Sequence, residues 1–279
     1  MATIPPTDRG GRARGTSGLP SWLRERGTAL EDAGRLAVGL LTLVPAGVVR
    51  TDRATAGRAM ALAPFIGLWL GLAAAFVLQV ADELGPNALV AATLGVGTLA
   101  LLTRLLHLDG LADTADALGS GKPAPAALDV MKRSDIGPFG VVAVLLAMLL
   151  QVGALTSAVG AGRGAVTLTL AAIAARLPLP YACRRGVPAA RTEGLGALVA
   201  GTVGPSGLVA ASAVSILGAL GAAAISSLEL WRTVLAVVLG LGAASLVLSW
   251  CVRRFEGITG DVLGALVETS TAVALLTLA

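Results

Sequence analysis

Long apolar stretches alternate with short polar connections along most of the chain. Each stretch has roughly twenty residues, the length that an α-helix needs to cross a hydrocarbon core about 30 Å thick. The sequence has no run of short segments with alternating polarity, the pattern typical of a membrane β-barrel. We therefore predict an all-α polytopic membrane helix bundle with seven transmembrane helices, over residues 60–81, 88–106, 139–160, 164–183, 206–228, 232–251 and 262–279.

The composition agrees with this prediction. Of the 279 residues, 55% are hydrophobic and only 14% are charged, whereas a soluble domain carries about a quarter charged residues. The 36 glycines favour close packing of transmembrane helices. A net charge of +4 does not indicate nucleic-acid binding, because the basic residues gather in connections between apolar stretches. We expect the lipid bilayer as a partner and no nucleic acid.

The start of the chain differs from the rest. Residues 1–32 are polar and rich in Arg, Gly, Pro and Thr, so we predict a partly disordered cytoplasmic tail, with a surface helix over residues 21–30 as an option. Residues 36–49 are apolar but short, and Pro45 interrupts them. We predict that this segment is re-entrant or interfacial, and that residues 33–279 form one transmembrane domain.

Charges in the connections predict the orientation of the helices. The connections 104–138, 184–197 and 252–261 are rich in Lys and Arg, whereas the short connections between the other spans carry few. The positive-inside rule therefore places these three connections in the cytoplasm. The basic stretch 50–59 belongs on the same side, which argues against a span over residues 36–49. An eight-span arrangement with the tail outside remains the alternative.

One acidic motif, His107 to Asp116, follows an apolar stretch directly. If the helix continues, Asp109, Asp113 and Asp116 are spaced i, i+4 and i+7 and share one face. Three neighbouring carboxylates repel each other unless a cation neutralises them, and hard oxygen ligands suit Mg²⁺. We predict that these aspartates bind Mg²⁺ for phosphoryl or nucleotidyl transfer. A solvated helix end is the alternative. His107 either caps or orients an aspartate, or it ligates the metal or moves a proton.

Three further polar stretches are predicted on the cytoplasmic side. Lys132, Arg133 and Arg184 can bind phosphate, although a plain basic flank is the alternative for each. Glu193 lies in a glycine-containing loop that can approach a phosphate or a sugar. Asp261 lies at the start of the last span, where it either caps that helix or serves the site. Together these stretches predict a metal-dependent enzyme that acts on a phosphorylated substrate at the membrane face.

Two buried charges stand apart from these stretches. Glu268 and Arg176 lie inside apolar runs, where a lone charge implies a partner. A structural ion pair and a role in substrate binding remain open for them.

The ordered motifs resemble the cobalamin 5′-phosphate synthase family, also called adenosylcobinamide-GDP ribazoletransferases, from about residue 36 to the end. The most specific match is the His-Leu-Asp-Gly-Leu-Ala-Asp-Thr-x-Asp stretch at His107–Asp116. Weaker matches are Arg58 with residues 64–68, and the segments 131–140, 193–196 and 259–265. Two departures occur: residues 132–135 read Lys-Arg-Ser-Asp where the family usually has Lys-Asp-Ser-Arg, and Glu256 replaces a frequent Gly.

The resemblance implies a Mg²⁺-dependent transferase in a bacterial inner membrane, with its active site facing the cytoplasm. It would join adenosylcobinamide-GDP to α-ribazole or α-ribazole 5′-phosphate and release GMP, late in cobalamin biosynthesis. Asp261, or less favourably His107, would accept the proton or complete the metal site. Contacts to the substrate phosphates would come from Lys132, Arg133, Ser134, Asp135, Arg58, Arg184 and Glu193. Formation of a homo-oligomer and association with other pathway enzymes are left open.

Two other functions compete with this one. A CDP-alcohol phosphotransferase would need an arginine after Asp109-Gly110, and none occurs there. A cation-coupled transporter would place its carboxylates near the bilayer midplane, between broken helices, whereas these aspartates adjoin a polar connection.

Overall fold

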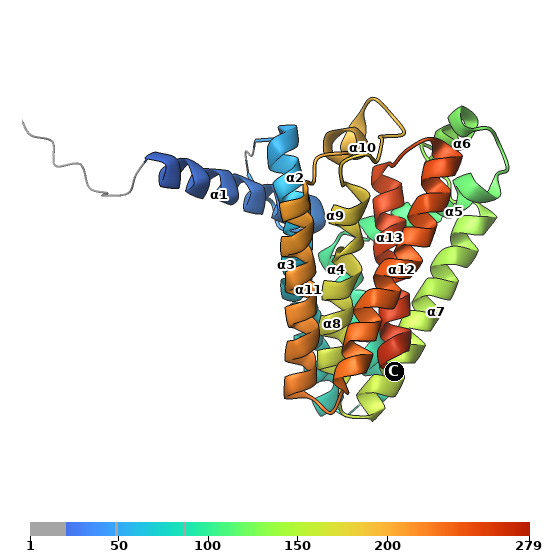
Figure 1. Ribbon diagram of the computed structural model, residues 1–279. Helices are drawn as coiled ribbons and strands as arrows, with labels where there is room; N and C mark the ends of the chain where they lie inside the picture. Colours follow the sequence, from blue (N-terminus) through green and yellow to red (C-terminus); the bar gives the residue numbers. More distant parts are fainter. Residues whose placement is uncertain (1–20, 48–49, 86) are drawn as a thin grey trace, which may run out of the picture.

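The computed structural model describes residues 21–47, 50–85 and 87–279 and is built of α-helices (Figure 1). The predicted disorder of residues 1–20 lies outside the described residues. Within these ranges no β-strand forms, and only two isolated β-bridges occur. The helices are α1 (Ser21–Leu41), α2 (Arg53–Ala61), α3 (Ala63–Glu83), α4 (Ala88–Leu102), α5 (Leu106–Gly119), α6 (Ala124–Val130), α7 (Pro138–Gly160), α8 (Gly164–Arg176), α9 (Pro178–Ala182), α10 (Gly194–Val199), α11 (Pro205–Ile225), α12 (Leu230–Phe255) and α13 (Gly260–Leu278).

All seven predicted spans are helical, which confirms a polytopic membrane helix bundle. Six spans in the described chain are long and apolar enough to cross a membrane: α3, α7, α8 with α9, α11, α12 and α13. The count reaches seven if α4 and α5 are taken as one span, although they are bent by 85°.

The bend between α4 and α5 corrects the predicted boundary of the second span. That span was expected to reach residue 106, but α4 ends at Leu102. Arg104 and Leu105 take left-handed backbone conformations, with φ of 54° and 57°, and the Leu105 N–H donates to the Ala100 carbonyl. This turn ends α4, so the aspartates lie on a separate helix that runs in a new direction.

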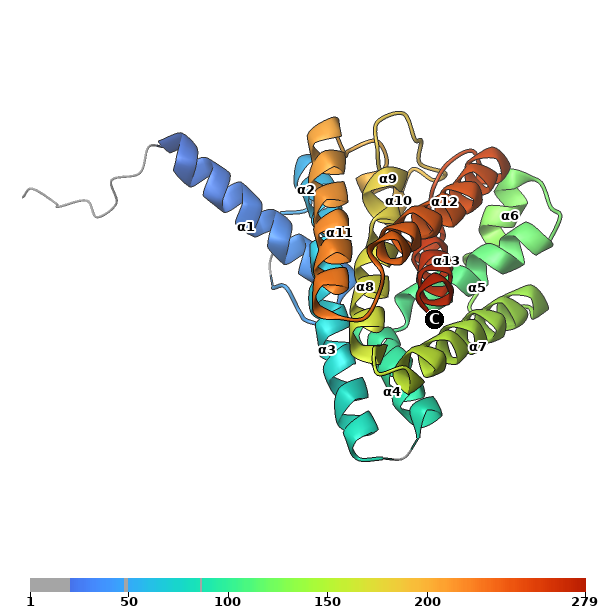
Figure 2. The same cartoon turned by 60° about the horizontal axis from the view of Figure 1, so that its bottom comes forward.

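Helices α8 and α13 form the centre of the bundle. Figure 2 shows both of them enclosed by α3, α7, α11 and α12. Small residues allow this close packing. Gly67 of α3, for example, lies so close to the backbone of Ala172 in α8 that a Cβ atom would overlap the Ala172 carbonyl.

Helix α1 lies across the bundle axis instead of along it (Figures 1 and 2). It carries six charged residues and is not among the candidate spans. Within the predicted segment 36–49, residues 36–47 supply the end of α1 and the turn after it, where the Leu43 N–H donates to the Leu102 carbonyl at 2.7 Å; residues 48–49 lie outside the described residues. This arrangement agrees with an interfacial segment. The helix is continuous through residue 33, the predicted start of the transmembrane domain.

The basic connections gather at one end of the bundle. Helices α2, α6 and α10 lie at that end, and the short turns after α3, α7 and α11 lie at the other (Figure 1). The predicted grouping of the three long connections is therefore confirmed. We call this end the polar end; it also contains the start of α13 and the candidate site.

Candidate active site

Helix α5 crosses the first turns of α13 at very short range. A Cβ atom on Gly110 would lie 2.6 Å from the Asp261 carbonyl oxygen, and one on Gly264 would lie 3.1 Å from the His107 backbone. Larger residues at these positions would force the helices apart. The glycines therefore allow the aspartates of α5 to lie beside the first turn of α13.

Three carboxylates from these two helices converge, and we call Asp109, Asp113 and Asp261 the acidic cluster. Asp109 is exposed, Asp113 is half-buried, and the Asp261 side chain is 27% exposed. The negative charges of Asp109, Asp261 and Asp116 act on Asp113, and the charge of Arg191 opposes them. The fold thus brings together carboxylates from the motifs at residues 107–116 and 259–265, which lie far apart in the sequence.

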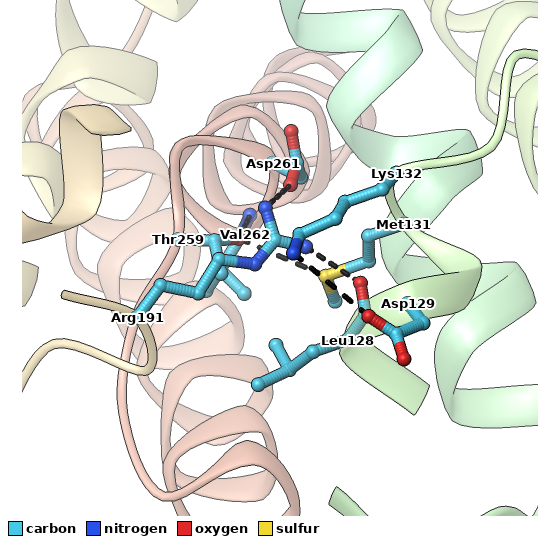
Figure 3. A network of polar contacts seen from close by, with 8 residues as sticks. All are labelled: Leu128, Asp129, Met131, Lys132, Arg191, Thr259, Asp261 and Val262. Carbon is cyan, nitrogen blue, oxygen red and sulfur yellow. Dashed lines mark hydrogen bonds and ion pairs between the residues drawn. The ribbon is translucent and has the colours of Figure 1, made fainter. Parts of the chain in front are cut away.

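Arg191 is a cation that lies beside Asp261, the member of this cluster drawn in Figure 3. Its Nη1 lies 3.9 Å from Asp261 Oδ2, and its Nη2 donates to the Leu128 carbonyl at 2.7 Å. Arg191 therefore links the 184–197 connection to α13 and α6. In the sequence, Arg191 was interpreted only as one of the basic residues of its connection. Its position two residues before Glu193 was the one feature that could have indicated a role in the site.

The start of α13 is capped by Thr259 and not by Asp261. The Thr259 hydroxyl accepts a hydrogen bond from the Val262 N–H at 3.2 Å, and it donates to the Met131 sulfur at 3.8 Å (Figure 3). The alternative in which Asp261 caps its own helix is therefore wrong. Besides the Thr259 side chain and its own backbone, the Asp261 carboxylate interacts with Arg191 and with Asp109.

Asp116 lies on the same helix but in different surroundings. Only 8% of it is exposed, and both of its oxygens accept hydrogen bonds from the backbone at the start of α7. The Gly137 N–H donates to Oδ2 at 2.6 Å, and the Gly140 N–H donates to Oδ1 at 2.9 Å. Asp116 therefore has partners that Asp109 and Asp113 lack.

The predicted phosphate-binding side chains lie at the polar end and are exposed. Ser134 and its neighbours form the turn between α6 and α7, where Lys132 lies 3.8 Å from Asp129. Arg184 donates to the Tyr181 carbonyl. Across the described residues, no hydrogen bond or ion pair joins this set to the acidic cluster. The set comprises Arg58 in α2, Lys132, Arg133, Ser134, Asp135, Arg184 and Glu193.

A second polar group lies inside the bundle, and we call Gln151, Arg176 and Glu268 the interior polar cluster. Gln151 Nε2 donates to Glu268 Oε2 at 2.7 Å, and all three side chains are buried. They line a cavity of about 10 Å³, room for about one water molecule. His107 of α5 is also buried, with its backbone packed against Gly264 of α13.

The donors at the polar end fit a magnesium ion that is completed by substrate. No group of three or more His, Cys, Asp or Glu side chains in the described ranges is arranged to hold a metal by itself. Mg²⁺ is usually bound through one or two carboxylates, several waters and substrate phosphates. The accessible, mutually repelling carboxylates of Asp109 and Asp113 match that donor set. Magnesium binding stays a prediction.

Comparisons with known proteins agree with the resemblance in the motifs. The family model described as cobalamin-5-phosphate synthase matches residues 33–279. Adenosylcobinamide-GDP ribazoletransferase of Frankia casuarinae is 45% identical over 263 residues, covering 88% of this chain and 93% of that protein. The protein of the same name from a Nocardioides species is 40% identical, covering 88% of this chain and 98% of that protein. The one from Bradyrhizobium diazoefficiens is 37% identical, covering 87% of this chain and 91% of that protein.

No solved structure matches the chain. The family match nevertheless covers every helix of the bundle from α2 to α13, including the acidic motif and the start of α13. It favours a transferase over the CDP-alcohol phosphotransferase and transporter alternatives. The chain therefore belongs to the cobalamin-5-phosphate synthase family.

Proposed function

We propose that this chain joins adenosylcobinamide-GDP to α-ribazole or α-ribazole 5′-phosphate and releases GMP, with Mg²⁺ as cofactor. The observation that carries the proposal is the close crossing of α5 and α13, in which the backbone of Asp261 packs against Gly110, so that Asp261 lies beside the helix that carries Asp109 and Asp113. Like charges held together at an accessible surface are costly unless a cation or a cationic group offsets them. A diphosphate substrate with a bound divalent cation meets that need.

In this proposal Asp109 and Asp113 hold the magnesium ion. They lie one helical turn apart on α5 and are the more accessible aspartates of that helix. When bound, the ion would supply positive charge to the diphosphate, the main contribution in transfers of this kind. Asp116 is left out of the ligand set because both of its oxygens already accept backbone N–H groups.

The reaction then needs a proton acceptor beside the attacking hydroxyl. A ribose hydroxyl of the ribazole attacks the phosphorus attached to cobinamide, the bond from that phosphorus to the bridging oxygen breaks, and GMP leaves with that oxygen. The hydroxyl proton passes to Asp261, whose carboxylate is partly exposed and is held by Arg191. His107 is less suited to this role because it is buried.

The exposed basic side chains would bind the substrate phosphates. Lys132 and Arg133 lie on the turn directly before α7, and Arg184 lies on the neighbouring connection. Arg58, Ser134, Asp135 and Glu193 would complete the substrate surface. We place this end of the bundle in the cytoplasm, with the chain in a bacterial inner membrane, because basic connections of membrane proteins stay on that side.

A direct assay tests the proposal. Purified membranes that contain the protein are incubated with adenosylcobinamide-GDP and either α-ribazole or its 5′-phosphate, with Mg²⁺ or with a chelator. We expect GMP and a cobalamin product to form in equal amounts with Mg²⁺ and not with the chelator. Asp82→Asn, at the opposite end of the bundle, is the matched control and should remain active. Undiminished GMP release in the presence of chelator would contradict the role of Mg²⁺.

A further inference from the structure

We propose that Asp116 is a positioning residue that caps α7 and fixes the turn of residues 132–135, and that it is not a ligand of the metal. The inference rests on the proposed function in one respect, namely that the turn binds the substrate phosphates. The sequence spacing groups Asp116 with Asp109 and Asp113, since all three share a face of α5. Their surroundings separate them.

Helix α7 needs a cap that its own sequence cannot supply. Its N-cap residue is Gly137, which has no side chain, and Pro138 follows it. The first N–H groups of a helix have no partner within the helix, and leaving them unpaired in a buried setting is costly. Asp116 meets this need from a neighbouring helix, because its two oxygens accept the N–H groups of Gly137 and Gly140. Its negative charge also favours the N-terminal end of the helix dipole.

Gly137 and Gly140 leave room for the Asp116 side chain because they have no Cβ atom. The three atoms nearest to a Cβ on Gly137 would all belong to Asp116, with Oδ1 at 2.5 Å and Cγ at 2.8 Å. A Cβ on Gly140 would also overlap the carboxylate. Gly137 has a φ of −89°, which any residue can adopt. Its lack of a side chain is therefore explained by the approach of Asp116 and not by the backbone.

The cap lies next to the predicted phosphate-binding turn. Lys132 and Arg133 are held on one side by Met131, which contacts Thr259 of α13, and on the other by the capped Gly137. Both ends of the turn are thereby anchored to the helices that carry the acidic cluster. Loss of the Asp116 cap should loosen the turn relative to Asp109 and Asp113 without removing a metal ligand.

The first experiment compares Asp116→Asn with Asp109→Asn and Asp113→Asn in the detergent-purified full chain. Binding of Mn²⁺, used as the probe, is measured by electron paramagnetic resonance with saturating adenosylcobinamide-GDP and no ribazole, and the spectrum of Mn²⁺ with that substrate alone is the baseline. We expect Asp116→Asn to bind Mn²⁺ like the native protein, while the other two variants lose binding. In steady-state assays Asp116→Asn should raise the KM for adenosylcobinamide-GDP more than it lowers kcat. Loss of Mn²⁺ binding in Asp116→Asn as severe as in Asp113→Asn would overturn the proposal.

Hydrogen exchange tests the cap without any assay of activity. In Asp116→Asn the backbone amides of Gly137 and Gly140 should exchange about tenfold faster, since a charge-assisted hydrogen bond is worth at least that factor. Amides in the middle of α7 should keep their native rates. Unchanged exchange at both glycines would contradict the cap.

A double-mutant cycle covers the case in which an Asp116 variant folds poorly. Gly137→Ala should lower the thermal unfolding midpoint in the native background and have much less effect in Asp116→Ala, because the overlapping atoms are then gone. Gly153→Ala in the same helix is the control, since its added Cβ meets nothing within 4 Å. If no Asp116 variant can be purified, Gly137→Ala should still be less stable than Gly153→Ala, and equal stability would contradict the contact.

These outcomes separate the cap from the proposed function. If Asp113→Asn keeps Mn²⁺ binding and activity, the metal assignment in the proposed function fails. The exchange rates of Gly137 and Gly140 and the Gly137→Ala cycle would still decide the role of Asp116.

Discussion

The acidic cluster and the interior polar cluster are the two places where this apolar bundle concentrates charge, and they are built in opposite ways. Asp109, Asp113 and Asp261 carry the same charge and lie at an accessible end, with Arg191 as the facing cation. In the interior polar cluster, Arg176 and Glu268 carry opposite charges and are almost fully buried.

The difference indicates what each region is for. Glu268 accepts a hydrogen bond from Gln151, and the opposite charge of Arg176 lines the same cavity, although no ion pair within 4.0 Å joins the two residues. The interior polar cluster thus contains charges of both signs. Arg176 Nε is fully buried without a hydrogen-bond partner, and Arg176 lines a cavity of about 10 Å³, which has room for a single water. The acidic cluster is unbalanced until something positive binds. Unbalanced charge at an accessible surface indicates a site that binds a ligand, whereas opposite charges in the core indicate a role in stabilising the fold.

The largest effect should follow from neutralising the most crowded carboxylate of the acidic cluster. Asp113→Asn should lower the rate of GMP release by about 1,000-fold, as expected when a group that stabilises transition-state charge is lost. The unfolding midpoint should stay the same or rise, because the variant removes repulsion with Asp109 and Asp261. Activity is measured in membranes and unfolding in detergent micelles.

Asp129→Asn provides a control for the loss of a charge at the same end, since Asp129 is an exposed carboxylate paired only with Lys132. It should keep most of the activity. If Asp113→Asn is inactive because it unfolds at a lower temperature, Asp113 stabilises the fold. The acidic cluster would then not differ from the interior polar cluster in its role.

The interior polar cluster should respond in the opposite sense. Glu268→Gln leaves the Arg176 charge buried without a counter-charge, which should cost about 3 kcal/mol of stability. The double variant Arg176→Met with Glu268→Met should recover most of that loss, since apolar side chains of similar size often replace buried opposite charges at little cost. Unfolding midpoints and activity per folded molecule are compared.

The expected pattern is a stability loss with activity retained to within about tenfold. A large loss of activity in Glu268→Gln, with an unchanged unfolding midpoint, would show that the interior polar cluster takes part in the reaction. In that case Arg176 and Glu268 would belong with the acidic cluster and the contrast between the two regions would fail.

Much of this fold could be predicted from the sequence because the bilayer imposes a length on every span. The seven apolar stretches are helical in the structure. The connections that are rich in Lys and Arg lie together at one end of the bundle, as their charge predicted. The bend before the aspartates could not be predicted, because the left-handed residues Arg104 and Leu105 are not glycines and no proline marks the site. The family's frequent Gly at position 256 had a physical reason that only the structure reveals: Glu256 adopts a left-handed backbone with φ of 63°.

The candidate site shows the same limit at the level of side chains. Helical spacing correctly placed Asp109, Asp113 and Asp116 on one face. It could not distinguish them, because the partner of Asp116 lies 21 residues further along the chain at Gly137. Arg191 was missed as a site residue for the same reason. Local periodicity determines which face a residue occupies, but tertiary packing determines what that residue meets.

The smallest effect should come from Arg191, and it tests how far the acidic cluster is from balance. Arg191→Gln removes the facing cation and its bond to the Leu128 carbonyl, which should cost about 1 kcal/mol of stability at this partly exposed site. Added Mg²⁺ should recover the electrostatic part of that loss, because the metal replaces the missing positive charge, and Arg191→Lys should need less Mg²⁺ than Arg191→Gln. Unfolding midpoints measured over a Mg²⁺ titration check this, with exposed Arg253→Gln at the same end as the control. If Mg²⁺ stabilises native protein and Arg191→Gln equally, Arg191 acts only as a tether between α6 and α13, and the acidic cluster is balanced by other means.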